Sequence, residues 1–227
     1  MLENLISLFF PKVCPGCHML LLGNEKVICT DCRHELPLTQ FHLHPENEGY
    51  KKFYGRIPVE FVAAMLYYHK KGIVQGLIHS LKYKGRQEIG TFLGEWYAED
   101  LSAIAILRTV DYIVPIPLHK KRLKKRGYNQ VDTFGTAISQ ALGIPFDDKI
   151  LIKKSYSKTQ SKKSFLERTS MKDSDFEVVF DDSHCHKHFL LIDDVLTTGT
   201  TLEHGARALL KIPNTKISIV TMAMSHA

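Results

Sequence analysis

A run of apolar residues over 189–192 ends in two adjacent carboxylates, Asp193 and Asp194, and leads into a loop of threonine and glycine. The apolar run is typical of a buried strand, and the residues after the loop have the apolar spacing of a helix over 200–211. A strand, a tight loop and a helix in this order bring acidic side chains and backbone N–H groups to one place. The segment therefore predicts an α/β fold with a site for a phosphorylated sugar at the end of this strand.

The side chains of this segment suit such a ligand. Asp193 and Asp194 can accept hydrogen bonds from sugar hydroxyls, or hold a hydrated Mg²⁺ ion. Gly199 permits a positive φ or a close approach of the phosphate. The residues predicted to bind the phosphate are Val195, Thr197, Thr198, Gly199, Thr200 and Thr201. An ordinary strand–turn–helix with capping side chains is the alternative, but two acids and four threonines exceed what capping requires.

The rest of the chain alternates between strand and helix patterns, which favours a mostly parallel sheet flanked by helices. Ligands bind such sheets at the carboxyl ends of the strands. The other phosphate-binding loop that could be expected, G-x-x-x-x-G-K-[ST], does not occur in the sequence, which argues against a P-loop ATPase or kinase. The predicted strands cover 59–68, 112–117, 176–180, 188–192 and 216–224. One predicted helix begins at residue 73, and three others cover 88–105, 129–142 and 200–211.

Four cysteines near the N-terminus form two C-x2-C pairs, Cys14 with Cys17 and Cys29 with Cys32. Two such turns can complete a tetrahedral metal site, and we interpret the four residues as ligands of a structural zinc ion. The alternatives are two disulfides, which a reducing compartment disfavours, or four unrelated buried cysteines. The fifth cysteine, Cys185, lies among His184, His186 and His188 and receives no predicted role.

The net charge of +6 is concentrated in two segments. Residues 120–126 hold six basic side chains and no acidic one, and residues 153–172 hold seven basic side chains and one acidic one. Two basic loops on a mildly acidic body indicate an anionic ligand, either a polyphosphate or a nucleic acid. Arg122, Arg126 and Asn129 are the candidates for contact with pyrophosphate or DNA, whereas an ordinary solvated surface is the alternative for the lysines.

The sequence lacks an apolar stretch long enough to cross a membrane, and residues 1–10 do not have the pattern of a signal peptide. We therefore expect a cytoplasmic protein without membrane insertion. We divide the chain into a zinc-ribbon-like module with its linker over 1–50 and a larger domain over 51–227. Within the larger domain, residues 51–110 form an accessory hood and residues 111–227 form the core.

Several motifs together resemble the ComF family of competence-associated proteins, which are similar to type I phosphoribosyltransferases. The acidic strand end and the threonine loop are similar to the loop with which those transferases bind phosphoribosyl pyrophosphate (PRPP). The other matching features are the cysteine pairs, Lys82–Gly85, Val114–Leu118, Arg122, Arg126–Gln130, Thr159 with Gln160, and Glu167 with Arg168.

The resemblance implies a type I phosphoribosyltransferase-like fold in which Asp193 and Asp194 hold the ribose hydroxyls and the loop holds the 5′-phosphate. It places Thr159, Gln160 and Arg168 in a mobile lid over the site, for which an ordinary surface loop is the alternative. It implies a Mg²⁺-dependent transferase acting on PRPP with an unknown acceptor, and a helicase-like ATPase as a partner in DNA uptake. The alternative is a non-catalytic sensor of PRPP or nucleotides, or a protein that binds single-stranded DNA.

Overall fold

The computed structural model describes residues 11–154 and 175–225. Its centre is a four-stranded sheet in the order β1-β6-β5-β2, in which all neighbouring strands are parallel. The carboxyl ends of the four strands therefore lie along one edge of the sheet. The strands are β1 (Phe61–Tyr68), β2 (Tyr112–Pro115), β5 (His188–Leu196) and β6 (Lys216–Ser225).

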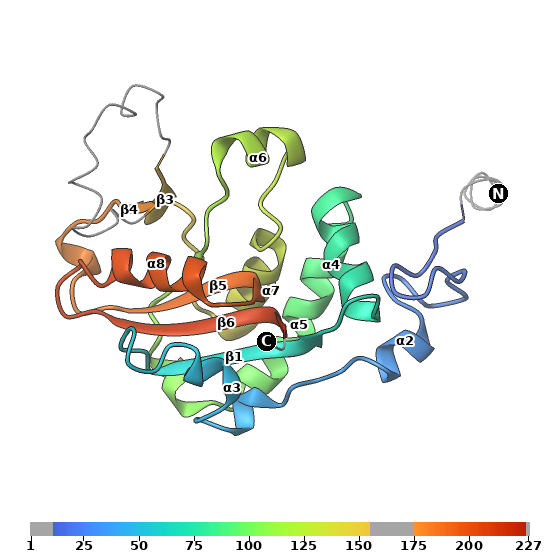
Figure 1. Cartoon of the computed structure of the whole chain (residues 1–227), viewed down its shortest axis with the longest axis horizontal. Helices are drawn as coiled ribbons and strands as arrows, with labels where there is room; N and C mark the ends of the chain where they lie inside the picture. Colours follow the sequence, from blue (N-terminus) through green and yellow to red (C-terminus); the bar gives the residue numbers. More distant parts are fainter. Residues whose placement is uncertain (1–10, 155–174, 226–227) are drawn as a thin grey trace.

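Helices cover both faces of this sheet (Figure 1). Successive residues of a strand point to opposite faces, so Leu191 and Ile192 of β5 identify the two layers. Leu191 contacts Gly205 of helix α8 (Thr200–Leu209), whereas Ile192 contacts Gly135 of helix α7 (Asp132–Leu142). A Cβ atom at either glycine would lie within 2.7 Å of a neighbouring side chain, so both helices pack very closely. The near-continuous apolar sequence of β5 follows from burial on both faces.

Two further helices extend the layer on the α7 side and lead toward the N-terminal module. Helix α5 (Glu88–Ser102) packs along α7 so closely that a Cβ atom on Gly94 would lie 2.6 Å from the carbonyl oxygen of Phe134. Helix α4 (Ile73–Tyr83) precedes it and carries its buried residues on one side, including Val74, Leu77 and Leu81. Both helices form where the sequence has apolar residues at helical spacing.

No helix in the described part of the chain is long and apolar enough to span a bilayer. Several shorter elements complete that part. They are the helices α2 (Thr30–His34), α3 (Glu48–Lys51) and α6 (Lys120–Arg126), the 3₁₀ helices η1 (Phe41–Leu43), η2 (Ala105–Thr109) and η5 (Asp182–His184), and the strands β3 (Leu151–Lys153) and β4 (Phe176–Val178).

The predicted class, a mostly parallel sheet flanked by helices, is confirmed, and three details differ from the sequence-based expectation. The basic segment 120–126 is the helix α6 rather than a loop; it begins at His119, which accepts a hydrogen bond from the Lys121 N–H, and ends at Gly127 with φ of 83°. Strand β4 pairs with β3 in a separate antiparallel ribbon. Strand β5 continues through both aspartates to Leu196, because pairing with β6 continues past Asp193.

Candidate functional site

The four N-terminal cysteines gather into one cluster, with all their sulfur atoms within 4.8 Å of one another. The sulfurs of Cys17 and Cys29 are 3.6 Å apart, close to the separation of about 3.8 Å that two thiolates have around a tetrahedral zinc ion. The backbone N–H of Cys29 donates to the Cys14 sulfur at 3.4 Å, as is common around metal-bound thiolates. The cysteines are thus positioned to bind a metal ion.

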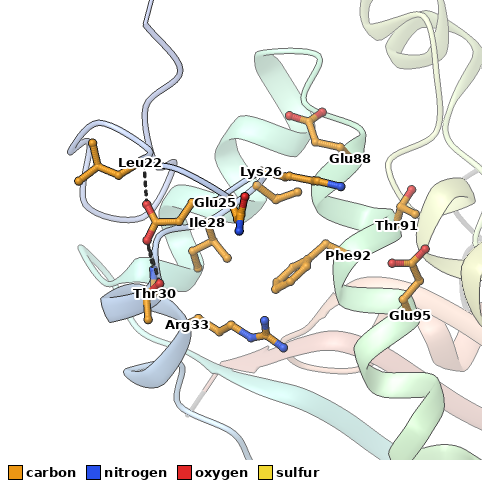
Figure 2. Close-up of a pocket in the computed structure, with 12 residues that line it drawn as sticks. Leu22, Glu25, Lys26, Ile28, Thr30, Arg33, Glu88, Thr91, Phe92 and Glu95 are labelled. Carbon is orange, nitrogen blue, oxygen red and sulfur yellow. Dashed lines mark hydrogen bonds between the residues drawn. The ribbon is translucent and has the colours of Figure 1, made fainter.

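The cysteine-bearing segment packs on α4 and α5, and Figure 2 shows its contact with α5. Arg33 of α2 lies over the rings of Phe92 and Trp96 on α5, at 5.7 and 5.1 Å from their centroids. A Cβ atom at Gly76 of α4 would lie 2.2 Å from the carbonyl oxygen of Pro15, so α4 approaches the first cysteine turn at van der Waals contact. A groove of about 650 Å³ lies between the cysteine-bearing segment and α5. Its lining contains both acidic and basic residues, so its charge does not indicate either an anionic or a cationic ligand.

A second cavity, of about 290 Å³, lies at the carboxyl edge of the sheet and brings together residues from distant parts of the chain. The acid pair of β5 and the start of the threonine loop contribute Asp193, Asp194, Val195, Thr197 and Thr201. The other lining residues are Lys82, Tyr83, Ile116, Pro117, Leu118, His119, Arg122, Arg126, Gln130 and Lys153. Acidic groups, hydroxyls and cations thus share one cleft, which we take as the candidate active site.

Asp194 is buried at the base of this cleft and has its charge balanced by the protein. Lys82, near the end of α4, places its ammonium 2.7 Å from Oδ1 of Asp194. The amide of Gln130 donates to Oδ2, and Arg126 donates in turn to Gln130. Arg126 also lies over the ring of Tyr83, at 5.2 Å from its centroid. Through this chain of contacts Asp194 ties α4 to α6.

Asp193 has a different environment from its neighbour. It keeps some exposure to the cleft, and its Oδ1 accepts a hydrogen bond from the Asp194 N–H at 2.8 Å. Burial raises the pKa of Asp193 to about 8, and the negative charge of Asp194 adds to the rise. The positive charges of Lys82 and Lys153 act in the opposite direction. Asp193 is therefore the carboxyl group of the pair that a cation or a sugar hydroxyl can engage.

The threonine loop leads into the N-terminus of α8. Gly199 has a φ of 80°, one of the two features that a glycine here permits, and it is the N-cap residue of α8. The first N–H groups of α8 have no carbonyl partner within the helix, and a helix N-terminus favours negative charge. Arg56 contacts the loop and the helix after it: it donates to the carbonyl oxygen of Thr198 at 3.1 Å and pairs with Glu203 of α8.

The candidates for pyrophosphate or DNA contact separate into two groups. Arg122 and Arg126 line the cleft, as the expectation requires. Asn129 lies outside the cleft lining; it is buried, and its amide donates to the carbonyl oxygen of Ile116 at 3.0 Å. Asn129 thereby holds the segment after β2 in place. The candidates for a lid, Thr159, Gln160 and Arg168, lie outside the described residues.

Sequence reasoning assigned no site role to four residues that the structure places at or beneath the cleft: Lys82, Gln130, Lys153 and Arg56. Lys82 and Gln130 belong to motifs that carry the ComF resemblance, so the motifs contained a usable signal. Lys153 ends β3 and lies over the ring of Phe176 at 5.0 Å. Nothing in the sequence near Arg56 indicates a role beneath a loop that lies 142 positions away.

Comparison with known proteins agrees with the sequence motifs, although no family model matches the chain. Competence protein F of Haemophilus influenzae is 30% identical over 118 residues, which cover 52% of each chain. The DNA utilization protein YhgH of Escherichia coli K12 is 28% identical over 82% of this chain and 79% of its own. Competence protein ComFC of Bacillus subtilis is 37% identical over 44% of this chain and 38% of its own.

The chain is thus similar in sequence to ComF competence proteins and to YhgH proteins. The match to the first of these relatives spans only about half of that protein's length. Among solved structures, the chain is similar to a glutamine PRPP amidotransferase from B. subtilis, with 19% identity over 63% of this chain and 30% of the other and a TM-score of 0.45. A purine phosphoribosyltransferase from Pyrococcus horikoshii is 21% identical over 57% of this chain and 75% of its own, with a TM-score of 0.34. No functional conclusion follows from scores this low.

Proposed function

We propose that the protein binds PRPP in the cleft at the carboxyl edge of the sheet and transfers its phosphoribosyl group to an acceptor. The observation that carries the proposal is the meeting of three kinds of group in one cavity of about 290 Å³. Carboxylates suit ribose hydroxyls, a helix N-terminus with hydroxyls suits a monophosphate, and arginines suit pyrophosphate. PRPP carries all three groups.

In this proposal each part of the cleft has one task. Asp193 and Asp194 orient the ribose, Thr197–Thr201 hold the 5′-phosphate, and Arg122 and Arg126 hold the pyrophosphate. Transfer breaks the bond between the anomeric carbon and pyrophosphate, which leaves with the electron pair. A new bond forms to the acceptor, which loses a proton. Catalysis then rests on positioning and on charge stabilisation of the leaving group.

The residues of the cleft fit a magnesium ion that enters with the pyrophosphate. Mg²⁺ is commonly bound by one or two carboxylates together with phosphate oxygens and water. Because both oxygens of Asp194 already have partners, Asp193 is the carboxyl group available to such an ion, which would have to displace the proton that its raised pKa retains. Its bound charge would neutralise the pyrophosphate as it leaves. For the four cysteines we propose structural zinc, which requires reduced thiols and therefore agrees with a cytoplasmic location.

The names of the relatives support a role in competence or DNA utilization, and a second observation favours binding of single-stranded DNA. A groove of about 390 Å³ continues from the cleft between α4 and α6. It combines cations with aromatic rings, as single-strand binding surfaces do. Its lining residues are Lys82, Tyr83, Gly85, Arg122, Lys125, Arg126 and Tyr128. A helicase-like ATPase is the partner that we propose for such a role.

Isothermal titration calorimetry with PRPP and MgCl₂ tests the first function. We expect wild-type protein to bind, and Asp193→Asn/Asp194→Asn to bind at least about 100-fold more weakly, because the variant lacks both carboxyl acceptors for the ribose hydroxyls. Asp182→Asn, at an exposed acid in η5, is the matched control and should bind like wild type. Absence of PRPP binding in folded, zinc-loaded wild-type protein would remove this function.

The salt dependence of binding to an oligothymidine strand tests the second function. Replacing Arg122 and Lys125 with glutamine should weaken binding and reduce the slope of log K against log salt by about 1–2, because each residue neutralises one phosphate. Lys211→Gln, an exposed lysine after α8, is the control. An unchanged slope in the double variant would exclude this groove as the DNA site.

A further inference from the structure

A third cavity, of about 310 Å³, adjoins the proposed PRPP cleft. The two cavities share four residues, which form the boundary between them: Lys82, Tyr83, Val195 and Thr197. The remaining lining of the third cavity consists of Tyr68, Gln75, Ile78, His79 and Ser225. A ribose held in the cleft therefore has this cavity as its immediate neighbour.

The third cavity lies on the opposite side of β5 from the residues proposed to hold pyrophosphate. Tyr68 ends β1 and Ser225 ends β6, and both strands lie on one side of β5 in the sheet. Arg122 and Arg126 belong to α6, which follows β2 on the other side. A group that enters from the side of β1 and β6 would approach the ribose from the direction opposite to the leaving group.

The lining of this cavity differs from that of the basic groove. None of its lining residues is acidic, and its one ammonium, Lys82, is already paired with Asp194. The rings of His79 and Tyr83 lie side by side on α4, with centroids 5.1 Å apart. Aromatic side chains and few charges suit a neutral planar ring better than a phosphate.

Gln75 adds a chemical preference to this lining. Its Oε1 accepts a hydrogen bond from the backbone N–H of Lys71 at 2.5 Å, which fixes the carboxamide with its oxygen turned toward that backbone. With its oxygen engaged, the carboxamide has its NH₂ group, a donor of two hydrogen bonds, left for a ligand in the cavity that Gln75 lines. A donor at this position favours a ligand that carries a carbonyl oxygen and disfavours one that presents an amino group.

We propose that this cavity binds a nucleobase-like heteroaromatic ring and prefers oxo-substituted over amino-substituted rings through Gln75. The inference rests on the proposed function, because the cavity is defined by its position beside the ribose. It assigns the acceptor, or the base of a nucleotide product, to the hood residues of α4 and to the ends of β1 and β6.

Calorimetry with three ligands that share a 5-phosphoribosyl group tests the inference: ribose 5-phosphate, UMP and CMP. UMP and CMP differ at position 4 of the ring, which bears oxygen in UMP and an amino group in CMP. We expect wild-type protein to bind UMP at least about tenfold more tightly than ribose 5-phosphate, and about fivefold more tightly than CMP.

The decisive variant is Gln75→Glu, which keeps the acceptor for the Lys71 N–H and replaces the NH₂ group with an oxygen. It should lower the ratio of UMP to CMP affinity to 1 or below, with an affinity for ribose 5-phosphate within about twofold of wild type. A second variant, His79→Leu at an exposed position, should reduce the affinity for both nucleotides by about threefold to tenfold through the lost ring contact.

The outcomes separate the two proposals. If ribose 5-phosphate fails to bind, the sugar-phosphate site is refuted and the inference falls with it. If ribose 5-phosphate binds and the ratio of UMP to CMP affinity is unchanged in Gln75→Glu, the cleft stands and the ring site is refuted. Equal affinities of wild-type protein for UMP and ribose 5-phosphate would also refute the ring site.

Discussion

The cysteine cluster and the acidic cleft are both groups of polar side chains, but they are built in different ways. The cluster uses four identical ligands from two short turns, and three of its four cysteines are buried. The cleft uses acids, cations and hydroxyls from β5, α8, α4, α6 and β3, and it is open to solvent. A closed set of ligands is typical of structural metal sites, whereas ligand sites keep an accessible position.

The two aspartates show the same contrast within the cleft itself. Asp194 is buried with partners on both oxygens, so it organises the protein around it. Asp193 keeps access to the cleft and a raised pKa. Asp194 is thus held by the protein in addition to its proposed contact with the ribose, whereas Asp193 is the more accessible acid. The predictions that follow address the cysteine cluster, the helix between the two sites and the two acids, in order of decreasing effect.

Replacing Cys14 and Cys32 with serine should have the largest effect, because metal binding supplies most of the folding free energy of so small a module. We expect the zinc content, measured by mass spectrometry, to fall from about one ion per chain to near zero. Limited proteolysis should then cut within residues 13–34. Cys185→Ser is the control, and equal zinc content in all three proteins would refute the cluster as the metal site.

Gly76→Ala tests whether the module and the cleft share α4 as a common support. Alanine favours helix by about 1 kcal/mol, but its Cβ would meet the Pro15 carbonyl oxygen, so we expect a net loss of about 2–3 kcal/mol. Urea unfolding measures this loss, with His79→Ala on the same helix as the control. An unchanged or increased midpoint would show that α4 and the first cysteine turn do not press against each other.

The raised pKa of Asp193 predicts a pH dependence of stability. The folded protein keeps the proton up to a pH of about 8, whereas the unfolded chain releases it near pH 4, so stability falls as pH rises between these values. Because Asp193 is partly exposed, we expect the fall due to this group to be roughly 1–2 kcal/mol. Asp193→Asn should flatten the dependence in urea unfolding from pH 5 to 8. Parallel curves for both proteins would contradict the assignment.

Lys82→Met should have the smallest effect on stability. It removes the ammonium that pairs with Asp194, but Lys82 keeps 22% of its side-chain exposure and Gln130 continues to donate to the acid. We therefore expect a loss of about 1 kcal/mol in urea unfolding. Lys84→Met, at the exposed end of α4, should change stability by less than about 0.5 kcal/mol. Equal results for the two variants would remove the ion pair from the account.

Features whose residues lie close together in the sequence could be predicted from it, whereas contacts between distant residues could not. The cysteine pairs and the segment from Asp193 to Thr201 lie close together along the chain, so spacing alone identified them. Lys82 and Gln130 reach Asp194 across 112 and 64 positions, and only the order of strands in the sheet brings them together. The assignment of residues 1–50 and 51–227 to separate units stays a prediction.

The helix α6 shows a second limit. Its residues are almost all charged, and none is buried, so no apolar face indicates a helix. The His119 cap and the positive φ of Gly127 define its ends, and both signals are weak without a periodic pattern between them. Because the segment is a helix rather than a loop, only some of its cations face the cleft, among them Arg122 and Arg126.

A crystal structure of the protein with PRPP and Mg²⁺ tests the central claim most directly. The account predicts the ribose hydroxyls against Asp193 and Asp194, the 5′-phosphate at Thr197–Thr201 and the N-terminus of α8, and the pyrophosphate toward Arg122 and Arg126. PRPP bound only in the groove between α4 and α6, with no phosphate at the threonine loop, would contradict it.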